Sequence, residues 1–339
     1  MDIKHASTFV DPYEQNNLNF FVFKEEENVV KDGIFVHFPS NNLYPVIDGV
    51  PVFIKNRVLI SFWETYKKEL LAIIPNEEII KIQLIKRIGN FSFSNEWGAA
   101  HKDNVTTVWG HSLIERLKIH YTDTESSEEE LGGQLLLDVG CGNGILCKSL
   151  AEKGATVFGI DYSTSVWNAQ KVMHHTNVCY IQADLHFLPF KDSTFDVVYS
   201  NGVLHHTADT ENAFQKVAKM VKSGGKYYVW LYSRSTSIGF NIFLYITDAM
   251  RFVTNKLPHF AQKIIIEKLL FCKILYCKMR GKQYEIGDIR TDLYDTLTPT
   301  YKYYHTVEET QDWFTKCGFN KPRKTHLNNY GFGVLGNKN

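Results

Sequence analysis

The pattern of apolar and polar positions is clearest at residues 135–144, LLLDVGCGNG, where a nearly unbroken apolar run ends in three glycines. An apolar run without alternation is typical of a parallel strand that is covered on both faces. Gly140, Gly142 and Gly144 allow positive φ angles and a close approach of the backbone to a ligand. Residues 145–153 then have the apolar spacing of a helix, whose N-terminus favours an anion. The segment predicts a buried strand, a glycine turn and a helix.

Further apolar runs follow at residues 155–160, 178–181, 196–200 and 226–232, and helical patterns lie between them. This alternation predicts an α/β fold whose ligand binds at the carboxyl ends of the strands. A pyridine dinucleotide would require glycine or alanine where the chain has Ile145, so NAD is the poorer fit. Asp161 ends the second run, about 20 residues after Gly140, and is placed to accept hydrogen bonds from a ribose. A nucleoside-containing ligand is therefore expected.

Five motifs in order carry a resemblance to a known family: LLLDVGCGNG, VFGID, IQAD, FDVVYSNGVLHH and VKSGGKYYVWLY. Over residues 135–232 the series resembles class I S-adenosylmethionine (SAM)-dependent methyltransferases. The resemblance implies a Rossmann-like seven-stranded α/β sheet whose last strand is antiparallel. It also implies SAM as methyl donor and S-adenosyl-L-homocysteine as product, and we expect no metal. The implied cofactor-binding residues are Asp138, Gly140, Cys141, Gly142, Gly144, Asp161, Tyr162, Asp184, Leu185, Asn201 and Gly202.

The resemblance also suggests roles for residues after the third and fourth strands. In the family, the acid at the position of Asp184 accepts from the adenine amino group, and the N–H of Leu185 helps to read the ring. Residues 200–203 are SNGV and not the N-P-P-Y type used on planar amino groups, which disfavours methylation of adenine N6 or glutamine amides. His205 and His206 are candidate catalytic residues, since a histidine beside the donor could take a proton from a hydroxyl or amine. The alternative is a structural or cofactor-side role, because LHH recurs in family members that act on different substrates.

Residues 1–60 are predicted to form an N-terminal β cap, with a hairpin turn at Asp48-Gly49. The stretch NNLYPVIDGVPVFI is similar to the zinc-ribbon-like domain typified by the activator subunit of tRNA and protein methyltransferases. That family carries cysteine ligands ahead of this stretch and this chain has none, so no metal is expected there. A cap packed on the catalytic domain and an independent binding module are the two alternatives.

Residues 61–110 are predicted to form a helical linker followed by an aromatic segment. In related methyltransferases such a segment lies over the SAM site, and Phe93, Trp97 and Trp109 fit that role, with Trp97 as a substrate contact. The alternative is that these aromatics serve only packing. Residues 111–339 are the predicted methyltransferase domain, with a helical lid inserted at 235–300.

The end of the chain resumes the core pattern with a capping box at Thr306 and a helix that ends near Gly318. Two further strands then complete the predicted sheet. The stretch PTYKYYHTVEETQDWFTKCGF resembles the tail of bacterial methyltransferases that have a ribbon-like cap, in which the aromatic-histidine stretch faces the pocket. Tyr301, Tyr304 and His305 are therefore candidate substrate contacts.

Charge and composition narrow the classes of partner. The chain has 37 Lys and Arg against 37 Asp and Glu, so no field of the whole chain favours nucleic acid. Its six cysteines contain no C-x-x-C pair, and the first residues lack the pattern of a secretory signal. The longest charge-free run of the insertion has 13 residues, shorter than a spanning helix needs. We therefore expect a cytoplasmic, soluble protein.

Residues 251–282 are an exception to this balance, with eight basic residues against one acid. Apolar triplets are threaded through the segment, which could contact an anionic substrate, a phospholipid surface or RNA. The alternative is a helical lid with a solvated lysine face. Nucleic acid is the less favoured partner, and peripheral membrane contact through 251–282 stays open.

The sequence therefore predicts an enzyme that transfers a methyl group from SAM to a nucleophile on a small molecule such as a sugar, a lipid or a secondary metabolite. The reaction chiefly requires alignment of the nucleophile with the sulfur–methyl bond, so a general base is optional. Two alternatives remain: an RNA methyltransferase that uses 251–282, and a non-catalytic SAM-binding regulatory protein.

Overall fold

A seven-stranded mixed sheet forms the centre of the protein in a computed structural model, which describes residues 1–54, 59–85, 107–108, 111–234, 238–279, 286–327 and 330–339. Its strands are β7 (Leu135–Val139), β8 (Thr156–Asp161), β9 (Val178–Gln182), β10 (Phe195–Asn201), β11 (Val221–Tyr232), β12 (Phe319–Leu327) and β13 (Gly331–Lys338). Their order is β12-β13-β11-β10-β7-β8-β9. The last strand, β13, lies between β11 and β12 and is antiparallel to both, whereas β7, β8, β9, β10 and β11 pair in parallel. The predicted fold class is confirmed.

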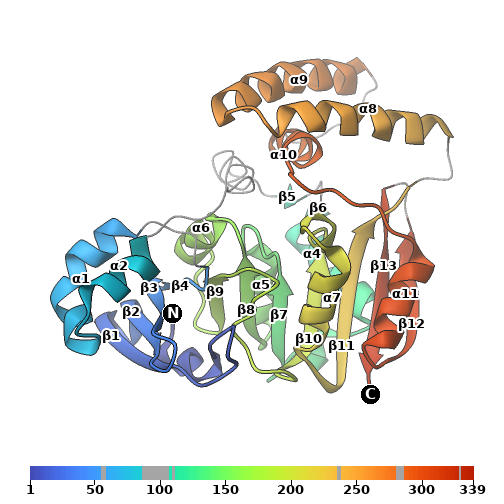
Figure 1. Ribbon diagram of the computed structural model, residues 1–339. Coiled ribbons are helices and arrows are strands. Elements are labelled where there is room, and N and C mark those ends of the chain that lie inside the picture. Colours follow the sequence, from blue (N-terminus) through green and yellow to red (C-terminus); the bar gives the residue numbers. More distant parts are fainter. Residues whose placement is uncertain (55–58, 86–106, 109–110, 235–237, 280–285, 328–329) are drawn as a thin grey trace.

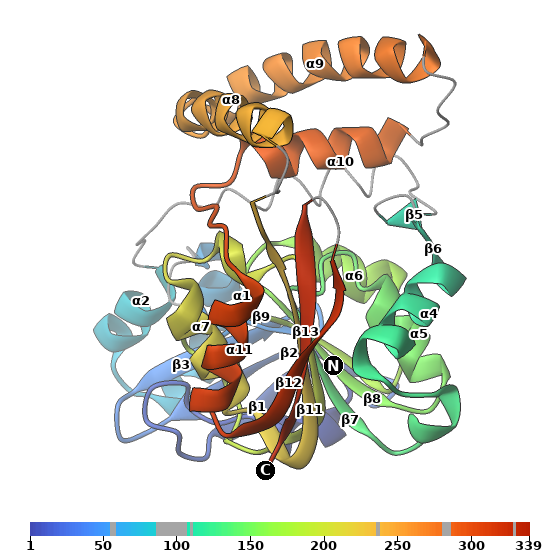
Figure 2. The ribbon, with the colours of Figure 1, turned by 90° about the vertical axis from the view of Figure 1, so that its right-hand side faces the viewer.

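Helices cover both faces of this sheet, as Figure 2 shows. On one face lie α4 (Leu113–Thr124), α5 (Ile145–Glu152) and α6 (Ser165–Val172), and on the other α7 (Thr210–Ala218) and α11 (Val307–Lys316). Short elements complete the core: β5 (Thr107–Val108), β6 (His111–Ser112), and the 3-10 turns η2 (Glu128–Glu130) and η3 (Leu204–His206). Because both faces are covered, the strands need apolar residues at successive positions, which explains the run at 135–139.

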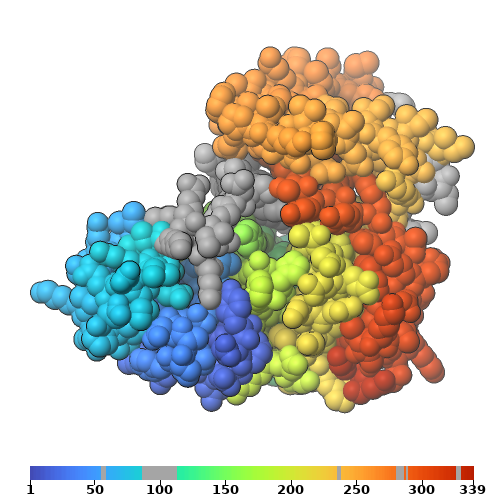
Figure 3. All heavy atoms as spheres, viewed as in Figure 1, coloured from blue at the N-terminus to red at the C-terminus, as the bar shows by residue number. Residues whose placement is uncertain are grey.

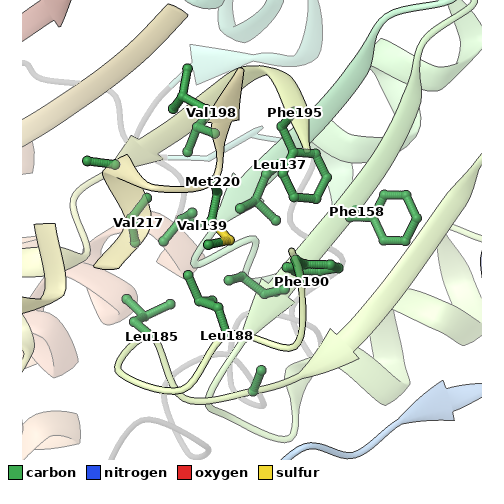
Figure 4. Packing of buried hydrophobic residues seen from close by; sticks show 14 of the residues in the cluster. Leu137, Val139, Phe158, Leu185, Leu188, Phe190, Phe195, Val198, Val217 and Met220 are labelled. Carbon is green, nitrogen blue, oxygen red and sulfur yellow. The ribbon is translucent and has the colours of Figure 1, made fainter. Parts of the chain in front are cut away.

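The apolar core beneath the strand ends is seen in Figure 4. Leu137, Phe158, Phe190 and Phe195 are at most 1% exposed and belong to one continuous cluster. The rings of Phe190 and Phe195 meet edge to face with their centroids 5.0 Å apart. This packing fixes the ends of β7 and β8, from which the glycine loop and Asp161 emerge.

The N-terminal module joins the central sheet at the edge formed by β9. It consists of η1 (Ile3–Thr8), β1 (Asn19–Glu26), β2 (Val29–His37), β3 (Asn42–Ile47), β4 (Val50–Pro51), α1 (Ile60–Ile73) and α2 (Glu77–Ile85). The four strands form an antiparallel sheet in the order β1-β2-β3-β4, with the predicted hairpin turn between β3 and β4. Asp48 and Gly49 have φ angles of 49° and 80° in this turn.

Contacts between this module and β9 cover the edge of the central sheet. Val52 pairs in parallel with Gln182, and the Phe53 N–H donates to the backbone oxygen of Gln182 at 2.8 Å. Phe9 packs against Phe158 and Phe190 in the same continuous core. In the described ranges, no group of three or more His, Cys, Asp or Glu side chains could hold a metal ion.

The insertion forms three helices above the carboxyl ends of the strands (Figure 1): α8 (Ile238–Thr254), α9 (His259–Met279) and α10 (Ile286–Leu297). Figures 1 and 2 agree that α8 and α9 form the outermost layer, and that α10 lies between them and the core. Leu270 and Cys277 of α9 pack with Ile289 of α10. Among the described helices, none is long and apolar enough to cross a membrane.

Candidate functional site

The glycine loop connects β7 to α5 and adopts the predicted left-handed conformations. Gly140, Gly142 and Gly144 have φ angles of 77°, 54° and 74°. A Cβ on Gly140 would lie 2.2 Å from Cγ2 of Val203, and a Cβ on Gly144 would lie 2.6 Å from the Tyr180 ring. Side chains at these two positions would therefore be excluded by contact as well as by backbone strain.

The end of β8 holds this loop by hydrogen bonds. The N–H groups of Gly140 and Cys141 donate to the Ile160 oxygen at 2.8 and 3.0 Å. The Gly142 N–H donates to Oδ2 of Asp161 at 3.0 Å, and the Ser163 N–H donates to Oδ1 at 2.8 Å. Asp161 thus stabilises the glycine loop, although it lies 19 residues after Gly142 in the sequence.

The Asp161 carboxylate fits the ribose of a nucleoside ligand. It is 8% exposed, and besides the N–H groups of Gly142 and Ser163 it interacts with the Ser163 side chain and the Tyr162 backbone. Burial raises the pKa of this carboxyl, and the backbone donors of Ser163 and Gly142 oppose that shift. A buried acceptor at the carboxyl end of a parallel strand, beside a glycine loop, is the arrangement that can accept hydrogen bonds from a ribose diol.

Asp138 lies deeper, at the end of β7. It is 6% exposed, and Sγ of Cys147 on α5 donates to its Oδ2 at 3.2 Å. Burial raises the pKa of Asp138 to about 6, although the Cys147 hydrogen bond acts in the opposite direction. The folded protein therefore binds a proton here at pH values where the unfolded chain has lost it.

Replacement of Asp138 by asparagine is expected to remove a pH dependence of stability. Because the folded pKa is raised to about 6 from 3.8, wild-type stability falls as pH rises through this interval and is constant above it. The stability of Asp138→Asn relative to wild type should increase by up to about 3 kcal/mol between pH 4 and pH 6.5. Urea unfolding of both proteins at several pH values measures this difference. A difference that does not change with pH would contradict the assignment.

The second acidic candidate, Asp184, lies beside Asp161. The Ala183 N–H donates to the backbone oxygen of Asp161 at 3.1 Å, which places the end of β9 next to the end of β8. Oδ1 of Asp184 accepts from the backbone N–H and Nδ1 of His186, both at 2.9 Å. This hydrogen bond raises the pKa of His186, and burial acts against it. No hydrogen bond to Oδ2 is found among the described residues, so this oxygen can accept from an adenine amino group.

His186 was not singled out from the sequence. An acid followed two residues later by a histidine is a weak signal, because the pairing depends on the turn that follows β9. Leu185, between the two, is 7% exposed and packs in the core beneath them.

The other predicted cofactor residues line the same strand ends. Nδ2 of Asn201 donates to the hydroxyl oxygen of Tyr199 at 2.8 Å, and Gly202 has a φ angle of 79°. The backbone oxygen of Tyr162 accepts a hydrogen bond from Nε2 of Gln182 at 2.8 Å. Cys141 is 8% exposed, and its N–H already binds Ile160, so its role is to hold the loop.

His205 is a fully buried residue of η3. Its Nδ1 lies 3.3 Å from the Tyr232 N–H, so Nδ1 is the acceptor and the proton lies on Nε2. Burial lowers the pKa of His205 well below its usual value. Nε2 is buried and has no hydrogen-bond partner among the described residues. This histidine is a neutral donor in the present arrangement, and Nε2 cannot serve as a base.

His206 connects the core to the lid. Its Nε2 lies 3.2 Å from Oδ1 of Asp295 on α10, and its Nδ1 lies 2.9 Å from the backbone carbonyl oxygen of Tyr301. The Tyr232 hydroxyl donates to the other oxygen of Asp295. Burial alone would raise the pKa of Asp295, but His206, Tyr232 and Lys302 together lower it.

A double-mutant cycle tests whether the contact between His206 and Asp295 fixes the lid. His206→Gln and Asp295→Asn should each destabilise the protein, and the double variant should lose less than the sum of the two. The coupling is expected to be about 1.5 to 3 kcal/mol, because each single change leaves a buried partner unsatisfied. Unfolding free energies of the four proteins give this value. Additive effects would show that the two side chains do not interact in solution.

The three residues predicted as substrate contacts at the end of the chain lie in two places. The backbone oxygen of Tyr301 contacts the His206 ring. The Tyr304 hydroxyl donates to Asp248 of α8, and the backbone N–H of His305 donates to the backbone oxygen of Tyr232. Tyr304 and His305 line a hollow of about 260 Å³ beside β11. The remaining lining residues of the hollow are Ser233, Arg234, Thr306, Val307 and Phe332.

Further polar residues at the lid contact were not predicted. Lys302 is largely buried, its Nζ lies 5.0 Å from the Tyr232 ring centroid, and burial lowers its pKa. Asp295 and Lys302 are brought to His206 only by the folding of the insertion, and no local motif marks them. Trp97, like Phe93 and Trp109, lies outside the described residues.

Comparisons with known proteins agree with this geometry. Residues 137–229 match the family described as methyltransferase domain. The ubiquinone biosynthesis O-methyltransferase of Coxiella burnetii is 30% identical over 149 residues, which cover 43% of this chain and 61% of the relative. An uncharacterized methyltransferase of Mycobacterium tuberculosis is 34% identical over 108 residues, or 32% of this chain and 55% of the relative. The chain thus spans less than two thirds of the length of these curated relatives.

Among solved structures, phosphoethanolamine N-methyltransferase 2 of Haemonchus contortus in complex with SAM is similar over 74% of this chain and 60% of that chain, with 15% identity and a TM-score of 0.46. The central fold follows from the strand order β12-β13-β11-β10-β7-β8-β9. The residues that match the methyltransferase-domain family, 137–229, coincide with the part of the fold from β7 to β11 that carries the glycine loop, Asp161 and Asp184.

Proposed function

We propose that this protein transfers a methyl group from SAM to a nucleophile on a small molecule. The observation that carries the proposal is the glycine loop, held by Asp161 at the carboxyl ends of β7 and β8. When bound, SAM supplies an electrophilic methyl group on a sulfonium centre. The class of acceptor includes sugars, lipids and secondary metabolites, and the similarity to a relative named as an O-methyltransferase supports an oxygen nucleophile.

The residues of this chain would act by binding and alignment. Asp161 would accept from the ribose and Oδ2 of Asp184 from the adenine, which fixes the nucleoside against the strand ends. Asn201, Gly202 and η3 adjoin the glycine loop through the contact of Val203 with Gly140. An acceptor held between these elements and α10 would be shielded from water by the lid, and in-line alignment at about 3 to 3.5 Å is the main requirement for methyl transfer.

The histidines limit what acid–base chemistry can be proposed. His205 presents a proton at Nε2, and His206 is engaged at both nitrogens. Neither is a free base while the lid is in place, so we propose that His206 positions the lid over the acceptor. This agrees with a reaction that needs no obligatory general base.

We further propose that the N-terminal module is a cap on the central sheet. The support is the shared core formed by Phe9, Phe158 and Phe190, together with the pairing of Val52 with Gln182. An independent binding module would not need so continuous a core with its neighbour.

Calorimetric titration with SAM and with S-adenosyl-L-homocysteine tests the proposal first, and a screen of small-molecule acceptors follows with mass spectrometry of the products. Micromolar binding of both nucleosides and a product heavier by one methyl group would support it. Tight SAM binding without turnover of any acceptor would instead favour a regulatory protein. Methylation of RNA, with binding that weakens steeply as salt increases, would favour the RNA alternative.

A further inference from the structure

The outer side of α8 is apolar where a surface helix is ordinarily polar. Leu244, Thr247 and Thr254 are buried and lie on one side of the helix. Ile242, Ile246 and Val253 lie on a side of the helix turned away from these residues, since each residue advances the helix by about 100°, and they are 55%, 56% and 59% exposed. Phe252, beside them, is 64% exposed. A helix that is apolar on both sides normally has both sides covered.

The outer side of α9 continues this apolar surface. Ile266, Leu270 and Cys277 face inward, whereas Phe260, Ile264, Phe271, Leu275 and Met279 are all more than half exposed. A shallow hollow of about 620 Å³ runs along this helix, and Ile264, Phe271, Lys263 and Lys268 are among its lining residues. We call the exposed residues of α8 and α9 the outer lid surface. Such a concentration of large apolar side chains marks an interaction site.

The charge of the outer lid surface is positive. Lys263, Lys268 and Lys278 are exposed on α9, and Lys256 is exposed in the turn between α8 and α9. The acid Glu267 is paired with Arg290, and Lys273 is paired with Asp292, so both are satisfied within the lid. Although the Glu267 side chain is 42% exposed, it is paired, so the unpaired exposed charge of this surface is carried by the lysines. Figure 3 shows the orange spheres of α8 and α9 at the top of the molecule, on the side away from the core.

We infer that the outer lid surface binds peripherally to an anionic lipid surface. Large aliphatic and aromatic side chains would enter the region between headgroups and acyl chains, and the lysine ammonium groups would meet the lipid phosphates. A second copy of the chain fits less well, because a two-fold contact through this surface would bring lysines of like charge together. RNA would use the lysines but would leave the exposed isoleucine, leucine and methionine side chains without a partner.

This docking would also orient the enzyme. α10 lies between the outer helices and the core, and its Asp295 is paired with His206. A lid lying on the lipid surface would therefore place the carboxyl ends of the sheet toward the membrane. If the proposed function is correct, an acceptor that partitions into lipid would have the shortest path to the site.

Vesicle flotation of the full chain tests the inference without any measurement of methyl transfer. The vesicles contain phosphatidylglycerol and phosphatidylcholine in equal parts, and vesicles of phosphatidylcholine alone serve as reference. We expect the protein to float with the anionic vesicles. The triple variant Lys263→Gln, Lys268→Gln, Lys278→Gln should bind about a hundredfold more weakly, since each lysine contributes roughly fivefold. The triple variant Ile246→Ser, Phe252→Ser, Phe271→Ser should lose binding even at low salt.

Matched controls use residues exposed on other faces of the protein. One control variant removes three exposed lysines from outside the lid: Lys191→Gln, Lys216→Gln, Lys219→Gln. The other removes three exposed apolar side chains from outside the lid: Ile3→Ser, Ile82→Ser, Val172→Ser. Both should float as wild type does. Failure of wild type to float, or equal losses in the controls, would overturn the inference.

Sedimentation in buffer without vesicles tests whether a second copy of the chain covers this surface instead. If wild type is a dimer and only the apolar lid variant is a monomer, the surface is a dimer contact and the lipid inference is wrong. SAM titration of each variant is read separately, so loss of lipid binding is distinguished from loss of the donor site.

Discussion

Gly140→Ala should reduce the affinity for SAM by at least about a hundredfold, or about 2.7 kcal/mol. Two costs add at this position. The φ angle of 77° is unfavourable for alanine, and the new Cβ would lie 2.2 Å from Cγ2 and 2.8 Å from Cγ1 of Val203. The loop must therefore move away from η3, and its hydrogen bonds to Ile160 and Asp161 will be disturbed. Calorimetric titration with SAM measures the loss, and thermal unfolding shows whether the protein remains folded.

Gly224→Ala provides a closely matched control. Gly224 has the same φ angle of 77°, but a Cβ there would meet nothing within 4 Å. The control should lose about 1 to 2 kcal/mol of stability from backbone strain alone and should bind SAM as wild type does. Adding Val203→Ala to Gly140→Ala removes the two closest methyl groups and should recover part of the affinity. Equal SAM affinity of the Gly140 and Gly224 variants would show that the contact with Val203 does not matter for binding.

Asp161→Ala is expected to weaken SAM binding about ten- to a hundredfold, which corresponds to roughly 1.5 to 3 kcal/mol. The substitution removes the proposed acceptor for the ribose, and it leaves the N–H groups of Gly142 and Ser163 without their carboxylate. The variant should therefore show a lower melting temperature as well as a lower affinity. Titration with SAM, and with S-adenosyl-L-homocysteine for comparison, measures the binding.

The control for this variant is Asp196→Ala at the opposite end of the sheet. Asp196 also accepts a backbone N–H, from Leu135 at 2.8 Å, but it lies at the amino end of β10. Its replacement should lower stability and leave SAM affinity unchanged. An Asp161→Ala protein that is folded and binds SAM as tightly as wild type would contradict the ribose assignment. A loss of equal size in Asp196→Ala would show that the effect is one of general stability.

The sequence by itself determined the central fold and the positions of the glycine loop and Asp161 at the strand ends. Apolar runs identify strands that are buried on both faces, and the glycines and Asp161 follow these strands directly. Because the chemistry at the end of a parallel strand lies within a few residues of the strand, short-range patterns were sufficient. The hairpin at Asp48-Gly49 was predictable for the same reason, since two adjacent residues fix the turn.

The tertiary structure alone decided what happens at the lid. The His206–Asp295 pair joins residues that are far apart in the chain, and nothing in the local sequence of α10 marks Asp295 as a partner. His186 likewise meets Asp184 only because of the turn after β9. The apolar positions of α8 and α9 were visible in the sequence, but whether they were buried or exposed was not. Helical spacing shows that residues share a side of a helix, whereas exposure depends on which sides its neighbours cover, and α10 covers only one.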